Sequence, residues 1–318
     1  MSYVLGIDGG GSKTVCVLMD DLRQVLGRGE AGPSNYQSIG IEATLQSIQS
    51  AIHNAVEAAR ITNTLKINAI CLGLAGVGRA ADIEVVKGLV QELQNNKLPI
   101  TWALQPANIV ICNDALIALV GGIGQPVGIV VVAGTGSIVF GRNYQGHTKR
   151  VGGWGYILGD EGSAYKIAIA GMNAALKSAD GREMSTSLIE GFKQDLDLES
   201  IEDLIEVIYR REWGVKQIAA LAPVVDFAAA SGDIVANSII DDAVKELVKA
   251  TSTVIDAIFS SDSVLEVVTT GSVWRGKCKM HEIFTASLVK KFPNLNVIFP
   301  RYEPAYGAGL LALLTTQN

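Results

Sequence analysis

The stretch that most constrains the fold is the glycine-rich segment Gly6-Ile7-Asp8-Gly9-Gly10-Gly11-Ser12-Lys13-Thr14 near the start of the chain. Apolar residues 3–7 lead into it, and a second apolar run, residues 15–19, follows it. This order predicts a strand, a tight glycine turn and a returning strand. Glycine lets backbone N–H groups approach an anion closely, and successive N–H groups in a turn form an anion-binding nest. The segment therefore predicts a phosphate-binding turn, with an ordinary hairpin turn as the alternative.

Two better-known phosphate loops do not fit this segment. A Walker A loop has glycine directly before its lysine, whereas Ser12 precedes Lys13 here. A dinucleotide-binding fingerprint is followed by a helix, whereas the residues after Thr14 read as a strand. Asp8 enters the turn from a buried strand, a position suited to holding a hydrated Mg²⁺.

Composition narrows the class of protein. The chain has 318 residues, of which 48% are hydrophobic and 18% charged, which predicts about two domains with large cores. The net charge of −6 and the lack of a basic stripe argue against a nucleic-acid partner. The cysteines form no C-x-x-C pair, no basic segment precedes the first apolar run, and no apolar run is long enough to cross a membrane. We expect a cytoplasmic protein without a membrane partner.

The apolar pattern predicts an α/β architecture made of two similar halves. In the first half we expect further strands at residues 24–31, 67–75 and 109–112, and helices at 39–60 and 80–94. In the second half we expect strands at residues 128–133, 138–141, 264–269 and 296–299, helices between 161 and about 260, and a last helix at about 305–314. Each half opens with a strand, a glycine turn and a return strand, so we expect a duplicated domain. The expected domains are residues 1–120, closed by a C-terminal helix within 305–318, and residues 121–304.

Three turns share one character, an apolar strand followed by small residues with hydroxyl groups. They lie at residues 8–14, 134–137 and 270–272. Phosphoryl transfer depends mostly on positioning and electrostatic stabilisation, so several such turns suit a phosphate-bearing ligand. The alternative is that all three are ordinary turns of an α/β fold.

Asp114 is the candidate catalytic residue. It follows a short buried strand and Asn113, so it would project at the carboxyl edge of the sheet, where ligands of α/β proteins bind. There it could accept the proton of a substrate hydroxyl that attacks a γ-phosphate. The alternative is a helix N-cap, because Asp114 directly precedes an apolar helical run.

Candidate residues for sugar recognition lie on polar loops. A carboxylate near an aromatic side chain suits a sugar, and Trp154 and Asp160 lie on neighbouring glycine-rich loops. Asn35 adds an amide in an earlier loop. Their alternatives are a helix-dipole interaction for Asp160 and a plain turn for Asn35. The three histidines have no metal-ligand spacing, so no metal site is assigned to them.

Taken together and in order, these motifs resemble the sugar kinases of the actin, Hsp70 and hexokinase superfamily, specifically the group of N-acetylglucosamine kinases and BadF/BadG-type ATPases. Residues 8–14 are similar to the first phosphate motif of the group, 134–137 to the second, and 269–274 to the adenosine motif. The most specific runs are residues 152–155 and 159–165, and residues 305–309 fit the closing helix.

The resemblance implies two actin-like, ribonuclease H-like domains with a cleft between them for ATP, Mg²⁺ and a sugar. It implies a kinase that phosphorylates an amino sugar or hexose at the 6-hydroxyl, with Asp114 as the base and Asp8 holding Mg²⁺ through water. The implied sugar contacts are Asn35, Asn113, Asp114, Gly153, Trp154, Gly155 and Asp160. The implied ATP contacts are Gly9, Gly10, Gly11, Ser12, Lys13, Thr14, Gly134, Thr135, Gly136, Ser137, Thr270, Gly271 and Ser272. A homodimer is possible by resemblance.

One position departs from the animal-type N-acetylglucosamine kinases, which carry asparagine after the second glycine turn. Here it is Ile138, which offers no side-chain hydrogen bond. Glucosamine and other hexoses therefore stay open as substrates. Two other functions also stay open: an ATPase that activates a partner enzyme, although the cysteines are poorly placed for the iron–sulfur cluster of such activators, and a nucleotide-dependent sugar sensor.

Overall fold

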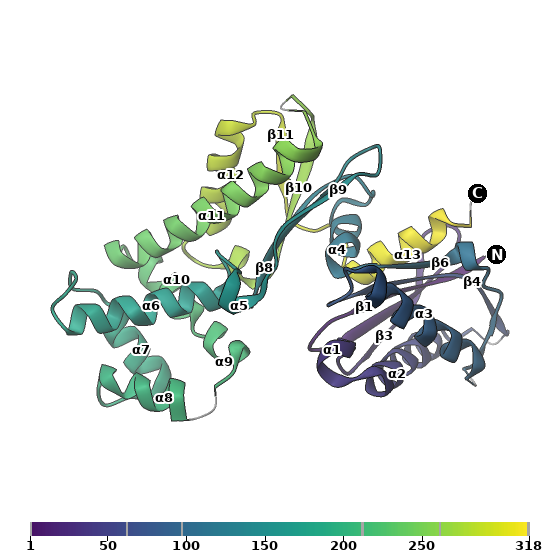
Figure 1. Ribbon diagram of the computed structural model, residues 1–318, viewed down its shortest axis with the longest axis horizontal. Helices are drawn as coiled ribbons and strands as arrows, with labels where there is room; N and C mark the ends of the chain where they lie inside the picture. Colours follow the sequence, from purple (N-terminus) through teal and green to yellow (C-terminus); the bar gives the residue numbers. More distant parts are fainter. Residues whose placement is uncertain (1, 62, 97, 211–212, 261, 317–318) are drawn as a thin grey trace. The chain divides into compact units, whose positions relative to one another are not determined.

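The computed structural model describes residues 2–61, 63–96, 98–210, 213–260 and 262–316 (Figure 1). The chain divides into two compact units, Met1–Val127 with Pro300–Asn318, and Gly128–Phe299. The boundary expected between residues 120 and 121 falls within helix α4 (Asp114–Ile123), which belongs to the first unit. Residues 211–212 of the expected helical stretch and 317–318 of the closing segment lie outside the described residues.

The first unit is built on one mixed sheet. Strand β1 pairs antiparallel with β2 and parallel with β4, and the order is β3-β2-β1-β4-β5, with β6 also paired to β4. The strands are β1 (Tyr3–Gly9), β2 (Thr14–Met19), β3 (Val25–Ala31), β4 (Leu65–Leu74), β5 (Ile100–Trp102) and β6 (Ile109–Asn113). Because β1, β4 and β6 run parallel, their carboxyl ends share one edge of the sheet.

Helices cover both faces of this sheet. Leu5 and Ile7 of β1 pack in one cluster with Ile48 of α2, whereas Gly6, whose side faces away from them, meets the backbone of α13. The helices are α1 (Tyr36–Ile39), α2 (Ile41–Ala59), α3 (Ala80–Asn95), the 3₁₀ turn η1 (Pro106–Asn108), α4, and α13 (Pro304–Leu314). The last helix of the chain therefore completes the first unit.

The sheet of the second unit repeats the strand order of the first. Its order is β11-β10-β7-β8-β9, in which β7, β8 and β9 form an antiparallel meander and β10 and β11 run parallel to β7. The strands are β7 (Gly128–Ala133), β8 (Ser137–Arg142), β9 (Thr148–Gly152), β10 (Leu265–Thr270) and β11 (Leu295–Ile298). Two sheets with one connectivity support the duplication expected from the sequence.

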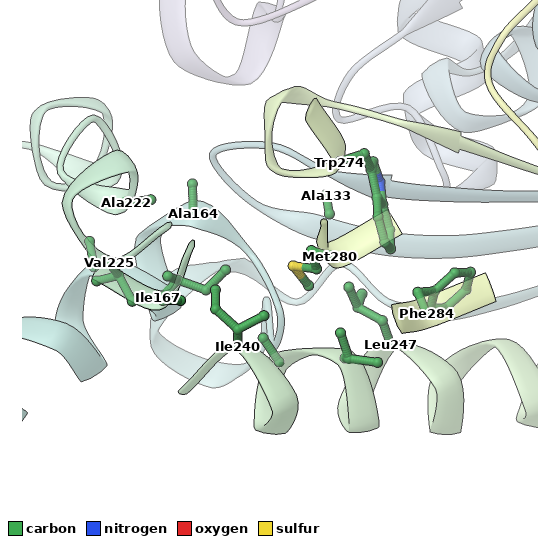
Figure 2. Packing of buried hydrophobic residues seen from close by; sticks show 14 of the residues in the cluster. Ala133, Ala164, Ile167, Ala222, Val225, Ile240, Leu247, Trp274, Met280 and Phe284 are labelled. Atoms are coloured by element: carbon green, nitrogen blue, oxygen red, sulfur yellow. The ribbon is translucent and has the colours of Figure 1, made fainter. Parts of the chain in front are cut away.

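A helical layer packs on the second sheet around one large apolar cluster. Figure 2 shows Trp274, Met280 and Phe284 beside Leu247 of α11, and Ile167, Val225 and Ile240 grouped near them. The helices are α5 (Gly155–Leu158), α6 (Ala164–Ala179), α7 (Leu188–Leu196), η2 (Ile201–Asp203), α8 (Leu204–Arg210), α9 (Val215–Ala219), α10 (Ala222–Ala230), α11 (Ile234–Ile258), η3 (Ser272–Arg275) and α12 (Met280–Lys291). This layer anchors the loops that carry the candidate site of the second unit.

Within the described residues, no single helix has the length and apolar composition needed to cross a membrane. One sharply bent pair, Val215–Ala230 with Ile234–Ile258, meets that test by length and composition alone.

Candidate active site

The first glycine turn connects β1 to β2 as predicted. It is closed by a hydrogen bond from the Gly10 N–H to the Lys13 carbonyl, 2.9 Å. Gly9 is fixed by close packing, since a Cβ there would lie 2.3 Å from side-chain atoms of Leu74 and Ser34. Gly11 has open space around it and Ser12 is exposed. The tip of the turn is therefore accessible to an anion, whereas its base is held rigidly.

Thr14, a predicted nucleotide contact, is buried in this structure. Its hydroxyl donates to the carbonyl of Gly32 at 2.7 Å and lies 2.8 Å from the Ser34 hydroxyl. These bonds tie the hairpin to the segment after β3. A buried hydroxyl with two partners in the protein stabilises the turn rather than a bound ligand.

Lys13 belongs to a chain of alternating charges on the surface of the first unit. Its ammonium pairs with Glu30 at 2.9 Å, and Glu30 pairs with Arg28 at 2.7 Å. Arg28 in turn grips Glu303 at the start of α13 with both Nε and Nη2, at 2.8 and 2.9 Å. The sequence could not indicate this row of ion pairs, because 275 positions separate Arg28 from Glu303. A phosphate group that binds Lys13 must therefore compete with Glu30.

Asp114 lies at the first residue of α4, at the carboxyl edge of the sheet. The cap of this helix is Asn113, whose side-chain oxygen accepts the Leu116 N–H at 2.8 Å. The alternative that Asp114 is the N-cap is therefore wrong, and its carboxylate remains available for chemistry. Asp114 keeps exposed surface, but the surrounding protein desolvates its carboxylate and raises its pKa, opposed by the N–H groups of Ala115 and of Asp114 itself.

Asp8 and Asp114 follow neighbouring parts of the same sheet edge and interact electrostatically. Asp8 pairs with Gly73 of β4, and Gly73 pairs with Cys112 of β6, two residues before Asp114. Burial, followed by the negative charges of Asp114 and Glu303, raises the pKa of Asp8 to about 7, although Lys13 opposes this. A concentration of carboxylates of this kind is relieved by a cation.

The residues around Asp8 suit a hydrated magnesium ion better than a closed metal cage. In the described part of the chain, no group of three or more histidine, cysteine, aspartate or glutamate side chains is placed to hold a metal ion. Mg²⁺ commonly takes one or two protein carboxylates, retains several waters and completes its shell with substrate phosphates. Asp8 offers the hard oxygen ligand that such a site needs.

In the second unit, two predicted nucleotide turns lie against each other. Strands β7 and β10 are parallel neighbours, so the turn after β7 meets the turn after β10. Gly271, with φ of +114°, approaches so closely that a Cβ would lie 2.2 Å from the Ala133 carbonyl oxygen and 2.9 Å from the Gly134 nitrogen. Any other residue at position 271 would push the two turns apart, so glycine is required here.

A cavity of about 470 Å³ opens beside these turns. Ser272, Val273, Arg275 and Lys277 line it from the segment after β10, and Ala164 and Ile167 line it from α6. Apolar walls with a few polar groups are typical of small-molecule sites. Ser272 is a predicted nucleotide contact. Arg275 and Lys277 are not, although Arg275 directly follows the predicted adenosine motif and Lys277 lies two residues further along the chain.

Asp160 links the second glycine turn to the predicted sugar loop. Its carboxylate accepts the backbone N–H of Ser137 and of Gly155, and a Cβ on Gly136 would come within 2.8 Å of it. Asp160 is buried and has a left-handed backbone, with φ of +62°. Burial raises the pKa of Asp160, and the two N–H groups oppose that rise. The side chain of Ser137 donates to the Glu161 carbonyl at 2.7 Å, so it supports the same junction.

The predicted sugar loop presents Trp154 to solvent. Glycines on both sides, Gly153 and Gly155, have φ of +70° and +84°, which turn the chain sharply around the indole. Ile138, the departure from the animal-type pattern, packs beneath this loop, since a Cβ on Gly153 would lie 2.8 Å from its Cδ1. Ile138 therefore supports the loop by packing rather than by hydrogen bonding.

The two predicted amides both act as helix caps. Asn35 caps α1 by accepting the Gln37 N–H at 3.1 Å, and a Cβ on Gly76 would lie 3.0 Å from its Oδ1. Asn113 caps α4 in the same way. The structure thus gives each amide a local role, and it places Asn113 beside Asp114 in the first unit.

The sequence matches one family model, described as the BadF/BadG/BcrA/BcrD ATPase family, over residues 5–312. The chain belongs to this family. Among its relatives are the N-acetylmuramic acid/N-acetylglucosamine kinase of Clostridium acetobutylicum, 36% identical over 98% of each chain, and the N-acetyl-D-glucosamine kinase of Dictyostelium discoideum, 33% identical over 97% of each chain. The family predicted from the motifs is therefore confirmed.

Solved structures agree on the fold. A protein from Chromobacterium violaceum, provisionally described as an N-acetylglucosamine kinase, superposes with a TM-score of 0.73 at 24% identity, over 98% of this chain and 99% of that one. A ROK family glucokinase from Streptomyces griseus, in complex with glucose and AMPPNP, gives 0.55 at 18% identity over the full length of both. The predicted class, α/β with two actin-like halves, is confirmed.

Proposed function

We propose that this protein transfers the γ-phosphoryl group of ATP to the 6-hydroxyl of an N-acetylated amino sugar, with N-acetylglucosamine as the first substrate. The observation that supports this best is the pair Asn113 and Asp114. Because Asn113 caps α4, the Asp114 carboxylate is left at the sheet edge with a raised pKa, as a general base requires. The names of two relatives that match the whole chain supply the sugar class.

In the proposed reaction the sugar oxygen attacks the γ-phosphorus while its proton passes to the carboxylate of Asp114. The bond from the γ-phosphorus to the bridging oxygen breaks, and ADP leaves with that oxygen. Asp8 would hold a hydrated Mg²⁺, which when bound would neutralise charge on the phosphates. The raised pKa of Asp114 makes its carboxylate a stronger base for this proton than an ordinary aspartate.

We assign the nucleotide to turns of both units. The backbone of Gly9, Gly10 and Gly11, with Ser12 and Lys13, would contact phosphate from the first unit. Gly134, Thr135, Gly136 and Ser137 would do so from the second, and Thr270, Gly271 and Ser272 would lie near the adenosine. The cavity beside η3 is the site that we propose for the base, because it borders the glycine contact between the last two turns.

We assign the sugar to Asn35, Asn113 and Asp114 in the first unit, and to Gly153, Trp154, Gly155 and Asp160 in the second. Asp160 supports this assignment, since it joins a phosphate turn and the sugar loop by two backbone hydrogen bonds. A movement of the sugar loop would therefore be transmitted through Asp160 to the phosphate turn. Glucosamine is the second candidate substrate, because a glucosamine kinase of Vibrio cholerae is a more distant relative, 27% identical over 62% of this chain.

The decisive assay is ADP release with ATP and Mg²⁺ against N-acetylglucosamine, glucosamine, N-acetylmannosamine and glucose, with a well that lacks sugar. We expect N-acetylglucosamine to give the greatest stimulation, and phosphorus NMR of the product to show a 6-phosphate. ADP release that no sugar stimulates would contradict the kinase and favour an activator of a partner enzyme. The possible homodimer and the cytoplasmic location stay predictions, of which light scattering can test the first.

Asp114→Asn tests the base directly. We expect the turnover rate to fall by about 10²–10⁴, because general-base catalysis is typically worth that much. Binding of ATP, measured by calorimetry, should change little. Asp21→Asn, at an exposed carboxylate after β2, is the matched control and should keep full turnover. Equal rates for Asp114→Asn and the parent protein would remove Asp114 from the mechanism.

A further inference from the structure

The sugar loop of the second unit carries a cation that the proposed kinase reaction does not use. The guanidinium carbon of Arg150 lies over the Trp154 ring, 4.5 Å from its centroid. Arg150 comes from β9, where it pairs with Phe140 of β8. Trp154 is 64% exposed, so the ring and the guanidinium together form an accessible surface. A cation thus lies next to the side chain proposed to contact the sugar.

Among the residues that the structure describes, this cation is not paired with a carboxylate. Several other exposed arginines pair with a carboxylate: Arg28 with Glu303, Arg182 with Asp180 and Arg210 with Glu206. For Arg150, the described parts of the chain provide no ion pair. An exposed cation–π contact is weak, so the guanidinium can leave the ring at small cost when a carboxylate is offered. A carboxylate would gain two parallel charge-assisted hydrogen bonds from it.

We propose that Arg150 is a specificity-determining residue that recognises a carboxylate on the sugar, and that the substrate class therefore includes N-acetylmuramic acid. This sugar is N-acetylglucosamine with a lactyl ether on O3, and the lactyl group carries the carboxylate. The proposal rests on the proposed function, because it takes Trp154 to be a sugar contact. It also agrees with the name of the relative from Clostridium acetobutylicum.

The charge of Arg150 also discriminates between the other two candidate substrates, glucosamine and N-acetylglucosamine. Glucosamine, when protonated, carries an ammonium group at C2, which Arg150 would repel. N-Acetylglucosamine is neutral and gains nothing from the charge. The order of preference at this position is therefore the acidic sugar, then the neutral one, then the cationic one.

The test compares kcat/KM for N-acetylmuramic acid, its neutral lactyl methyl ester and N-acetylglucosamine in four proteins: the parent, Arg150→Gln, Arg150→Lys and Lys149→Gln. We expect Arg150→Gln to reduce kcat/KM for N-acetylmuramic acid about tenfold or more beyond any change with N-acetylglucosamine, because a hydrogen bond to a charged group is lost. The parent should prefer the free acid to the ester, and Arg150→Gln should not. Arg150→Lys should retain part of the preference, since it keeps the charge without the planar fork.

Lys149→Gln is the control, since it removes the same charge from the neighbouring residue, whose side chain points to the opposite side of β9. It should leave the preference between the two sugars unchanged. The role of Arg150 would be overturned if Lys149→Gln and Arg150→Gln reduced kcat/KM for N-acetylmuramic acid equally. It would also be overturned if Arg150→Gln reduced kcat/KM equally for both sugars, or if the parent protein preferred the ester. Phosphorylation of N-acetylglucosamine without N-acetylmuramic acid would overturn it as well and leave the kinase standing. Phosphorylation of neither sugar would overturn both proposals.

Discussion

At the scale of single residues, Lys13 pairs with a carboxylate of its own unit. Its partner Glu30 is exposed, and it also pairs with Arg28. Hydrogen bonds from Lys13 and then Arg28 lower the pKa of Glu30, because they favour its charged form. The pairing holds the lysine side chain against β3, and Glu30 would compete with a phosphate for its ammonium. The ion pair between Lys13 and Glu30 thus both positions the lysine and competes with a phosphate for it.

Glu30→Gln should release this competition. Exposed ion pairs are weak, so we expect the KM for ATP to fall by only a few-fold, up to about fivefold, at low ionic strength. The gain should shrink in high salt, which screens exposed charges. Glu84→Gln, which breaks the exposed pair with Lys87 in α3, is the control for net charge. A similar fall in both variants would show that the effect is not local to the turn.

At the scale of elements, helix starts organise the polar residues of the first unit. The start of α3 is the most heavily bonded. Asp82 accepts the backbone N–H of Arg79 at 2.8 Å and of Gly78 at 3.2 Å, and the Tyr36 hydroxyl at 2.6 Å. The Arg79 side chain adds two further bonds. Asp82 thereby joins α3 to α1, the helix that Asn35 caps.

These bonds predict how stability depends on pH. The side-chain bond from Arg79, followed by that from Tyr36, holds the pKa of Asp82 well below its ordinary value. A carboxyl group with a lowered pKa stabilises the fold above its unfolded pKa of about 4, and this stabilisation is lost as pH falls below that value. Asp82→Asn should therefore lower Tm at pH 7, and the deficit should shrink towards pH 3.

Thermal unfolding followed by circular dichroism from pH 7 to pH 3 would measure this. Glu92→Gln removes the same charge from the exposed face of the same helix and serves as the control. A Tm difference between Asp82→Asn and the parent that stays constant over this range would contradict the proposed dependence of stability on the ionisation of Asp82.

The sequence predicted most of these elements because their apolar patterns are strong. It missed β5, which has only three residues, and β9, whose exposed Lys149 and Arg150 hide the strand pattern at a sheet edge. It also missed α12. The fold class and the glycine turns followed from local pattern, as in the hairpin of β1 and β2.

Long-range partners could not be predicted in this way. Whether Asn113 or Asp114 caps α4 depends on the residue at which the helix begins, and the sequence pattern does not define a helix start to one residue. The pairing of Arg28 with Glu303, and the bonds of Asp160 to Ser137 and Gly155, join segments whose proximity only the folded chain determines. These are also the contacts that give the candidate site its charge arrangement.

At the scale of the whole molecule, α13 is joined to the first unit through glycines. A Cβ on Gly307 would lie 2.2 Å from the Ile117 carbonyl oxygen and 2.3 Å from the Gly121 nitrogen, both backbone atoms of α4. A Cβ on Gly6 would lie 2.2 Å from the Gly309 nitrogen. Helices α4 and α13 and strand β1 therefore meet backbone to backbone, with no room for a methyl group.

Gly307→Ala should destabilise the first unit strongly, because backbone atoms cannot yield as a flexible side chain does. Overpacking of this kind typically costs about 1–3 kcal/mol. Gly88→Ala is the control, since Gly88 lies within α3 with open space around it, and alanine there should be neutral or stabilising by up to about 1 kcal/mol. Urea unfolding curves of both variants and of the parent would measure the change in the free energy of unfolding. Equal midpoints for Gly307→Ala and the parent would show that the helices separate easily.

The position of α13 also sets an order of events during synthesis. Residues 128–299 are complete before α13 leaves the ribosome, so the second unit can fold while the first still lacks a helix that packs on β1. Until then Gly6 and its apolar neighbours face water, and exposed surface of this kind attracts chaperones or aggregates. A chain that lacks residues 304–314 would thus keep all its predicted ligand residues and lose the helix that covers Gly6 in the first unit.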